Sequence, residues 1–271
     1  MGSQSIGGWQ TVDRTRDPQE FVRYLKRVSD NPRLRENSLA RLRASGIEHG
    51  STVLDLGCGI GSNTLMLAEH VGPSGLVRAV DRSRTMIETT ARRAREGGLR
   101  IVCDEADAAS LPFGDDSFDA VWIERVLMHV PDPLAVMREA RRVLHPAGRF
   151  VVMESEAMSL SISDGGDPAL ARRMERHWID GIAHPRIGQA LESLALRAGF
   201  GGIRVEEKIA EVRDFTFAAD TFSWQERLRS LIGEGSVTGE RAERWLETVR
   251  GEAERDQVIC SLDFFEMVAR P

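Results

Sequence analysis

Three glycines at alternate positions, Gly57, Gly59 and Gly61, follow a short apolar run that contains Asp55. Such a run is typical of a buried parallel strand, and glycines after it let the backbone approach a ligand closely because no Cβ occupies the space. A helical pattern begins at Ser62. Strand, glycine turn and helix together indicate the nucleotide-binding half of a doubly wound sheet.

Acidic residues recur at equal spacing through this region. Asp55, Asp81 and Asp107 each lie in, at the end of, or just beyond an expected strand. The carboxyl ends of parallel strands meet at one edge of a sheet, where ligands bind. Asp81 can accept both hydrogen bonds of a ribose diol, and Asp107 with the backbone of Ala108 is placed to meet an adenine amino group. The spacing therefore predicts a nucleoside-binding edge.

His129 is the candidate general base. It follows the fourth expected strand at the same edge, and imidazole titrates near neutral pH. The alternative is a structural histidine that caps the turn before Pro131. Glu154 and Glu156, after the fifth expected strand, either face a substrate or lie on the surface.

The elements that must position these residues alternate between strand and helix from residue 52 onwards. This rhythm implies right-handed crossovers and a parallel sheet. Strands are expected at 53–56, 76–80, 99–103, 118–123, 149–153, 203–212 and 258–269, and helices at 62–68, 83–95, 133–144 and 187–198. The fold class is therefore predicted to be α/β, a doubly wound and mostly parallel seven-stranded sheet with a helical cap.

We expect a single domain over 1–271 with three parts. Residues 1–45 carry N-terminal helices whose arginines form a solvated face, and 50–155 carry the glycine turn. Residues 156–271 form the substrate-side half with a helical insertion at 219–255. Long bare connections are uncommon, so we interpret the insertion and the N-terminal helices as a lid.

Aromatic side chains are concentrated in the second half of the chain. Core packing explains such residues, but an aromatic cap over the sheet edge also suits a planar or apolar substrate. The residues are Trp178, Phe215, Phe217, Phe222, Trp224 and Trp245.

Composition places the chain among soluble globular enzymes: 41% of residues are hydrophobic, 29% are charged, and the net charge is −6. The negative charge argues against a nucleic-acid partner, and no apolar run reaches the ~20 residues of a membrane span. The three cysteines, Cys58, Cys103 and Cys260, form no ligand pair, so neither a metal nor a disulfide is expected. The polar first ten residues lack signal-peptide order, which favours a cytoplasmic location. Whether the chain forms a homo-oligomer is left open.

Residues 50–155 resemble the class I S-adenosylmethionine-dependent methyltransferases, most closely the branch that modifies small molecules such as quinones, sterols and antibiotics. The motifs that carry the resemblance, in order, are Val53–Gly61, Val80–Ser83, Asp107–Ala108 with Leu111–Phe113, Ser117–Val121, Met128–Val130 with Asp132–Pro133, and Arg142–Arg149.

The resemblance implies S-adenosyl-L-methionine as cofactor and methyl transfer to an oxygen, nitrogen or carbon atom of a small molecule, with a bacterial secondary metabolite as acceptor. The glycines would line its methionine and ribose portions, Asp55 would support the turn and the methionyl amine, and Glu124 would lie beside the methionyl end. The cofactor-binding residues that it implies are Asp55, Gly57, Cys58, Gly59, Gly61, Asn63, Asp81, Arg82, Met86, Asp107, Ala108 and Glu124.

Other readings remain open. Some relatives keep this fold and cofactor but act as cyclases, hydroxylases or decarboxylases. A nicotinamide dehydrogenase would need glycine at Ser62 to complete its G-x-G-x-x-G pattern. Enzymes that methylate nucleic-acid bases often carry an Asn/Asp-Pro-Pro-aromatic turn where this chain has Glu124 to Leu127. A non-enzymatic binding module is the last alternative.

Overall fold

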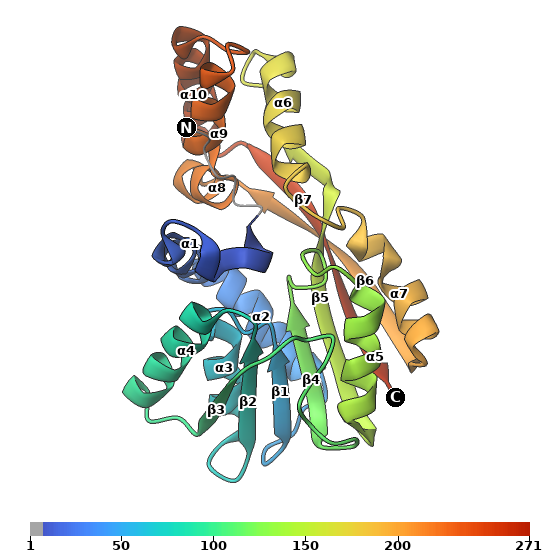
Figure 1. Cartoon of the computed structure of the whole chain (residues 1–271). Coiled ribbons are helices and arrows are strands. Elements are labelled where there is room, and N and C mark those ends of the chain that lie inside the picture. Colours follow the sequence, from blue (N-terminus) through green and yellow to red (C-terminus); the bar gives the residue numbers. More distant parts are fainter. Residues whose placement is uncertain (1–7) are drawn as a thin grey trace.

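One seven-stranded sheet organises the protein, whose structure, a computed structural model, describes residues 8–271 (Figure 1). Its strand order is β3-β2-β1-β4-β5-β7-β6, with parallel pairing from β3 to β5 and antiparallel pairing of β7 with both neighbours. The predicted α/β fold class is therefore confirmed. The first seven residues of the predicted 1–45 segment lie outside the described residues. The strands are β1 (Thr52–Leu56), β2 (Leu76–Asp81), β3 (Ile101–Glu105), β4 (Phe118–Glu124), β5 (Leu144–Ile162), β6 (Gly201–Val212) and β7 (Cys260–Arg270).

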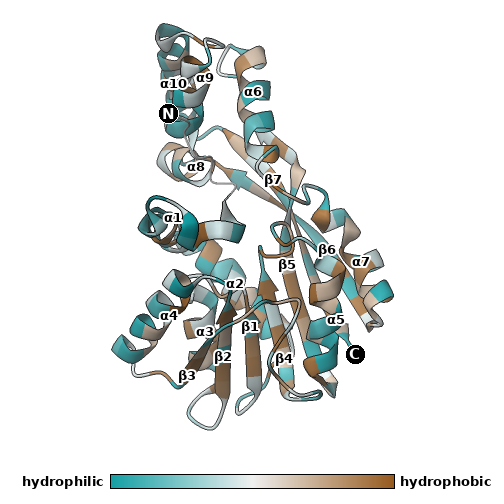
Figure 2. Cartoon of the chain, in the orientation of Figure 1, coloured by the Kyte–Doolittle hydropathy of each residue, from teal (hydrophilic) through white to brown (hydrophobic). Residues whose placement is uncertain are grey.

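Helices cover both faces of the sheet. On one face, α2 and α3 pack against strand residues such as Val53 and Trp122; on the other, α5 and α7 pack against residues such as Ile123 and Phe150 (Figure 1). In Figure 2 the strands between these layers are the most hydrophobic part of the chain. The helices are η1 (Trp9–Arg14), α1 (Pro18–Ser29), α2 (Pro32–Ala44), α3 (Ser62–Val71), α4 (Arg84–Glu96), α5 (Pro133–Val143), α6 (Pro168–Ile179), α7 (Ile187–Ala198), α8 (Phe215–Thr221), α9 (Trp224–Gly233) and α10 (Gly239–Glu254).

Local sequence explains where several helices begin. In α1, α2, α5 and α6 the first residue is proline, which lacks the N–H that a helix start leaves unpaired. The preceding side chain accepts a backbone N–H of the first turn in each case. These capping residues are Asp17, Asn31, Asp132 and Asp167.

Most strand bounds lie one or two residues from the predicted ones, and the fifth strand is much longer than predicted. The third strand begins at Ile101 rather than residue 99, because the Leu99 N–H still bonds the Ala94 carbonyl at the end of α4 (3.0 Å). The fifth strand was expected at 149–153 but spans Leu144–Ile162, because β7 continues to pair with it past an irregularity between Glu156 and Ser161.

The extended ends of β5 and β7 carry a second hydrophobic cluster. Leu160, Ile162 and Leu262 pack there against α6, α8, α9 and α10, which stand beyond the main sheet in Figure 1. Trp224 and Trp245 are fully buried in this cluster, with ring centroids 5.2 Å apart. For these two tryptophans, core packing is the correct interpretation.

The N-terminal arginines do not all form a solvated face. Arg41 in α2 is only 6% exposed. Its guanidinium donates to Glu124 Oε2 (2.7 Å) and to Glu266 Oε1 (2.8 Å), which ties α2 to the end of β4 and to the middle of β7. The helical pattern had placed this residue among exposed charges.

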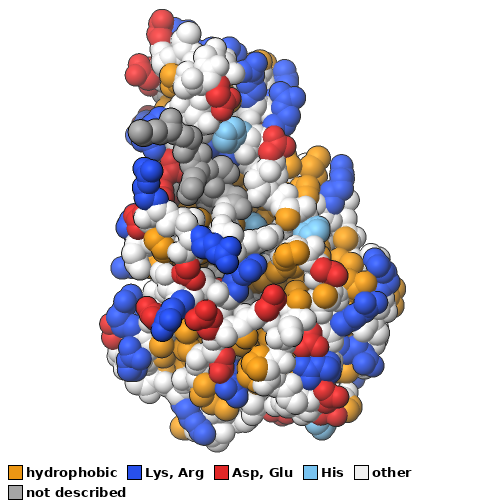
Figure 3. All heavy atoms as spheres, viewed as in Figure 1, with side chains coloured by type: hydrophobic (Ala, Val, Ile, Leu, Met, Phe, Trp, Pro, Cys, Tyr) orange, Lys and Arg blue, Asp and Glu red, His pale blue; other side chains and the backbone are white. Residues whose placement is uncertain are grey.

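Charged side chains of both signs are interspersed over the face shown in Figure 3. Among residues 8–271, no helix combines the length and the apolar content that a bilayer span requires. The described part of the chain also contains no group of three or more His, Cys, Asp or Glu side chains that could hold a metal ion. Cys58, Cys103 and Cys260 are free thiols.

Candidate active site

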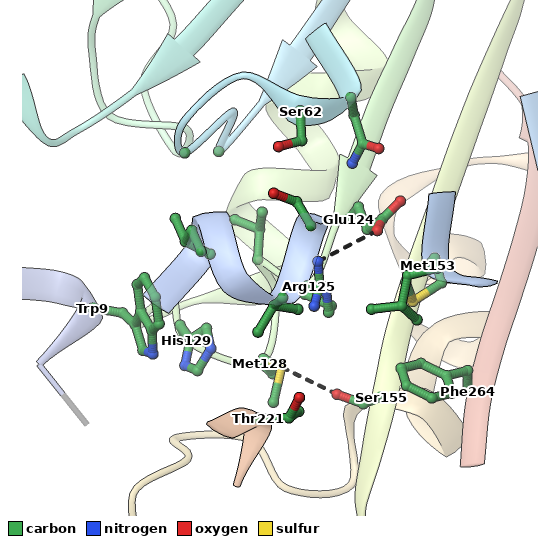
Figure 4. A pocket seen from close by; sticks show the side chains of 18 of the residues that line it. Trp9, Ser62, Glu124, Arg125, Met128, His129, Met153, Ser155, Thr221 and Phe264 are labelled. Carbon is green, nitrogen blue, oxygen red and sulfur yellow. Dashed lines mark hydrogen bonds and ion pairs between the residues drawn. The ribbon is translucent and has the colours of Figure 1, made fainter. Parts of the chain in front are cut away.

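A cavity of about 1170 Å³ lies where β1, β2 and β4 end. Its walls come from the glycine turn, the loop after β4, the N-terminal elements η1, α1 and α2, and the inserted helices α8 and α9 (Figure 4). Pockets for one small ligand are about 300–1,000 Å³, so this volume is sufficient for two. The N-terminal helices and the inserted helices thus line the same cavity, although they are far apart in sequence.

The glycine turn is wedged between two other segments. A Cβ at Gly57 would lie 2.3 Å from Val126 in the loop after β4, and a Cβ at Gly59 would lie 3.1 Å from Leu25 of α1. Both glycines have positive φ, +72° and +53°, which side-chain-bearing residues rarely adopt. At Gly57 and Gly59, which both line the cavity, the turn carries no side chain.

Asp81 ends β2 at the cavity wall. Its Oδ2 accepts the Gly59 N–H (3.0 Å) and its Oδ1 accepts the Ser83 N–H (2.9 Å). Burial raises the pKa of Asp81, while these two N–H groups act in the opposite direction. Each carboxylate oxygen keeps a second acceptor site, so the fixed carboxylate can still receive a diol.

An apolar slot adjoins Asp81. Met86, Ala106 and Ala108 line it, with Arg82 and Asp107 at its polar rim. The Asp107 carboxylate already accepts the Ala109 N–H (2.9 Å), which fixes its orientation. A flat heterocycle attached to a diol would fit this slot and the adjacent carboxylate.

Two residues expected at the site lie behind it instead. Asp55 is 2% exposed, accepts the Thr64 hydroxyl (2.6 Å) and lines no part of the cavity. Burial raises its pKa to about 7, opposed by that hydrogen bond. Gly61 faces α4, where a Cβ would lie 2.7 Å from Thr90, so it allows helix packing rather than ligand approach. The remaining expected residues line the cavity: Gly57, Cys58, Gly59, Asn63, Asp81, Arg82, Met86, Asp107, Ala108, Glu124 and His129.

Glu124 reaches the cavity as part of an ion-pair network. Arg41 holds its Oε2, and Arg125 Nη2 lies 3.6 Å from its Oε1. The carboxylate therefore faces the cavity in a fixed orientation, beside the glycine turn in Figure 4.

His129 lies in the loop after β4, with its ring tilted by 34° against that of Trp9 at a centroid distance of 5.7 Å. The side-chain amide of Gln10 donates to the His129 carbonyl (2.6 Å), and the backbone N–H of His129 donates to the Val126 carbonyl. Burial and, secondarily, the charge of Arg125 lower the pKa of His129 to about 4. Its imidazole is therefore neutral at physiological pH, and the same burial disfavours its protonated form.

Glu154 shapes this loop rather than facing a substrate. Its carboxylate accepts the N–H groups of Val126 (2.8 Å), Leu127 (2.6 Å) and Met128 (3.4 Å). Burial raises its pKa to about 7, against these hydrogen bonds. Glu156 bonds the Gln189 N–H at the start of α7. Neither residue is on the surface, and both lie within β5.

Sequence reasoning missed several residues of the cavity wall. Trp9, Tyr24, Thr221 and Arg227 come from η1, α1, α8 and α9 and meet only in the folded chain. The sequence signal that could have pointed to Thr221 and Arg227 is the helical insertion at 219–255, which is predicted to cover the site. No motif distinguishes Arg227 from the many exposed arginines.

Comparison with known proteins identifies the domain. Residues 54–152 match the family described as methyltransferase domain. The chain is 40% identical over 124 residues to methyltransferase GfsG of Streptomyces halstedii (45% of this chain, 43% of that protein). It is 38% identical over 115 residues to a demethylmenaquinone methyltransferase of Bacillus velezensis (42% and 49%). Residues 54–152 thus carry a methyltransferase domain of the class I S-adenosylmethionine-dependent type.

A longer match extends beyond the methyltransferase domain. An uncharacterized 37.1 kDa protein in transposon TN4556 of Streptomyces fradiae is 36% identical over 227 residues, which cover 83% of this chain and 65% of that protein. The chain therefore spans about two thirds of this relative and about half of the two named methyltransferases.

Solved structures agree with the methyltransferase fold. The [4+2]-cyclase SpnF superimposes with a TM-score of 0.56 at 25% identity, over 88% of this chain and 80% of that one. S-adenosyl-L-methionine is the cofactor of this family, and the residues present fit it. The buried Asp81 carboxylate suits its ribose, and the slot beside Met86 suits its adenine.

Proposed function

We propose that the protein transfers a methyl group from S-adenosyl-L-methionine to an oxygen, nitrogen or carbon atom of a small molecule. The observation that carries this proposal is the pairing of Asp81 with the glycine turn inside a cavity that has room for a second ligand. The cofactor supplies an electrophilic methyl group when bound. The acceptor must then reach it in line, with water excluded.

This chain's residues divide that work. Asp81 would bind the ribose and Glu124 the methionyl end, while Met86 and Ala108 would pack on the adenine. Trp9 and α1 would exclude water from above the glycine turn. His129, neutral and packed against Trp9, is the group placed to take a proton from the acceptor.

The acceptor region is largely apolar and aromatic. Met128, Trp178, Phe217, Phe222 and Phe264 line it, from the loop after β4, α6, the lid and β7. We infer an acceptor with an apolar or planar body, and we propose that α1 and α8 to α10 act as its lid. The named relatives, one of them in Streptomyces, support a bacterial secondary metabolite as the acceptor class.

Calorimetric titration with S-adenosylhomocysteine tests the cofactor assignment. Asp81→Asn should weaken binding at least tenfold, about 1.4 kcal/mol, because an amide cannot replace a carboxylate that accepts from the diol and two backbone N–H groups. Asp180→Asn, an exposed position in a helix C-cap, is the matched control and should bind normally. Equal affinity of the Asp81→Asn variant and the original protein would contradict the ribose assignment.

A cyclase is the second candidate, because the [4+2]-cyclase SpnF shares the fold at 25% identity. In that case the cofactor would bind without losing its methyl group. Incubation with methyl-labelled S-adenosylmethionine and a panel of quinols, phenols and macrolactones separates the two candidates. Methyl transfer produces S-adenosylhomocysteine in proportion to product, whereas cyclisation produces none.

A further inference from the structure

Arg227 is a buried cation in the wall of the cavity. It lies in α9 and is 6% exposed. Its Nε donates to the Phe222 carbonyl (2.7 Å), and its Nη1 lies 2.8 Å from His177 Nδ1 and also donates to the His177 carbonyl. These contacts fix the guanidinium plane between the ends of α8 and α6.

None of these contacts neutralises the charge of Arg227. Among the described residues, no carboxylate lies within ion-pair distance of Arg227, and its Nη2 has no hydrogen-bond partner. Arg41 is equally buried but holds two carboxylates. Burying a charge without a counter-ion is costly, and burial lowers the pKa of Arg227 to about 10.

Polar groups around Arg227 are also incompletely paired. The Thr221 hydroxyl is buried and has no partner among residues 8–271. The Thr221 carbonyl accepts the Tyr24 hydroxyl (3.1 Å), which joins α8 to α1. Burial raises the pKa of Tyr24, against the positive charges of Arg125 and Arg227. Positive potential and an unused hydroxyl thus meet in one corner.

This corner is the far end of the cavity from the glycine turn. In Figure 4, Thr221 and Ser62 lie at opposite ends of the view, with Met128 between them. The rings of Trp178 and Phe222 meet edge to face, with centroids 5.3 Å apart, and form the apolar wall beside Arg227. A ligand that extends from the cofactor end would bring its distal group to this corner.

We propose that Arg227 and Thr221 bind an anionic oxygen at the distal end of the acceptor, so that the acceptor combines an apolar body with a carboxylate or an acidic enol or phenol. This inference rests on the proposed function and names its substrate class. An anion there would supply the counter-charge that Arg227 lacks and two acceptor lone pairs for Nη2 and the Thr221 hydroxyl.

A matched ligand pair tests the proposal. In calorimetry with saturating S-adenosylhomocysteine, 1-naphthoate and its neutral isostere 1-naphthamide are compared on the original protein and on Arg227→Gln. The original protein should prefer the carboxylate about tenfold, and Arg227→Gln should remove this preference without changing the affinity for S-adenosylhomocysteine. Arg229→Gln, the same charge change at an exposed position of α9, should keep it.

Each outcome decides the inference. Equal binding of both ligands by the original protein, failure of the naphthoate to bind, or an unchanged preference in Arg227→Gln would overturn it. If Arg227→Gln fails to fold, Thr221→Val takes its place and should weaken naphthoate binding about threefold or more; no change would again be contrary. If the original protein does not bind S-adenosylhomocysteine, the proposed function itself is refuted.

Discussion

Single residues of the cavity differ in how their burial is compensated. Asp81 and Glu154 are carboxylates fixed by backbone N–H groups, Arg41 is a cation fixed by carboxylates, and Arg227 has only neutral partners. His129 has no polar partner for its ring among the described residues and packs against the tilted ring of Trp9. His129 and Arg227, to which we assign proton acceptance and acceptor binding, are thus less completely paired than the carboxylates of Asp81 and Glu154.

The chemistry of His129 has a measurable pH consequence. A base must be neutral, and a pKa lowered from 6.5 to about 4 keeps the imidazole neutral through most of the acid range. We expect kcat/KM to remain level as pH falls through 6.5, with its acid limb near the lowered value. An acid limb of kcat/KM at pH 6.5 would show instead that burial does not lower the pKa of the His129 ring.

Replacement of His129 tests the same assignment without varying pH. His129→Ala should lower turnover about 10²–10⁴-fold, with any acceptor that supports turnover, because a general base contributes that much. Affinity for S-adenosylhomocysteine should stay within a factor of two or so of the original value. His145→Ala, at an exposed position near the start of β5, is the control. Full activity of His129→Ala would leave this histidine with a structural role.

Sequence alone located the groups that local patterns determine. Asp81 and Asp107 were placed correctly at the cavity because parallel strands align their ends, whatever the rest of the chain does. Asp55 and Gly61 belong to the same motif but support the turn from behind instead of lining the cavity. This difference depends on the contacts of Asp55 with Thr64 and of Gly61 with Thr90. Arg227 could not be predicted, because its burial depends on α6 and α8.

At the level of elements, connections between distant segments hold the cavity walls together. Arg41 joins α2 to β4 and β7, and Lys208 of β6 also contacts Glu266. Burial acts to raise the pKa of Glu266, but the charges of Arg41 and Lys208 overcome it and lower the value. The contribution of Glu266 to stability is therefore present above its unfolded pKa of 4.5 and is lost as pH falls below it.

Removal of Arg41 should be strongly destabilising. Arg41→Ala removes the buried cation that joins Glu124 to Glu266, and leaves only Arg125 near Glu124 and Lys208 near Glu266 among the described residues. Breaking a buried ion pair typically costs about 3–5 kcal/mol in the free energy of unfolding. Urea denaturation at pH 7 measures the loss. Arg43→Ala, exposed on the same helix, should change stability by no more than about 0.5 kcal/mol. A similar small effect for both variants would mean that the Arg41 ion pairs add nothing.

The limits of sequence reasoning at this scale follow from β5. Its buried core at 149–153 has a clear apolar pattern, but its extension to Ile162 is determined by pairing with β7, a strand more than a hundred residues later. The helices capped by Asp-Pro and Asn-Pro were predictable because their start signals are local. Long-range pairing and ion pairs leave no local signal.

In the whole molecule, the cavity lies between two parts of the structure, each with its own hydrophobic cluster. The sheet with α2 to α5 and α7 forms one part, and the cluster on the ends of β5 and β7 carries the lid. The N-terminal elements bridge the gap through few contacts. Asp13 accepts the Ser83 hydroxyl (3.0 Å) and the N–H groups of Arg84 (2.8 Å) and Thr85 (3.2 Å), so it caps α4 from a distant segment.

This arrangement predicts how ligand binding redistributes stability. Leu25 covers Gly59 and Trp9 covers His129, so η1 and α1 must open for a ligand in the glycine turn to leave. S-adenosylhomocysteine at a hundred times its dissociation constant stabilises the closed form by about 2.7 kcal/mol. Amide hydrogen exchange, followed by mass spectrometry, should therefore slow by up to about a hundredfold in 9–29. Exchange in α10, which packs in the separate lid cluster, should change little. Equal slowing in both segments would indicate global stabilisation alone, and unchanged exchange in 9–29 would mean that the N-terminal helices do not close over the cofactor.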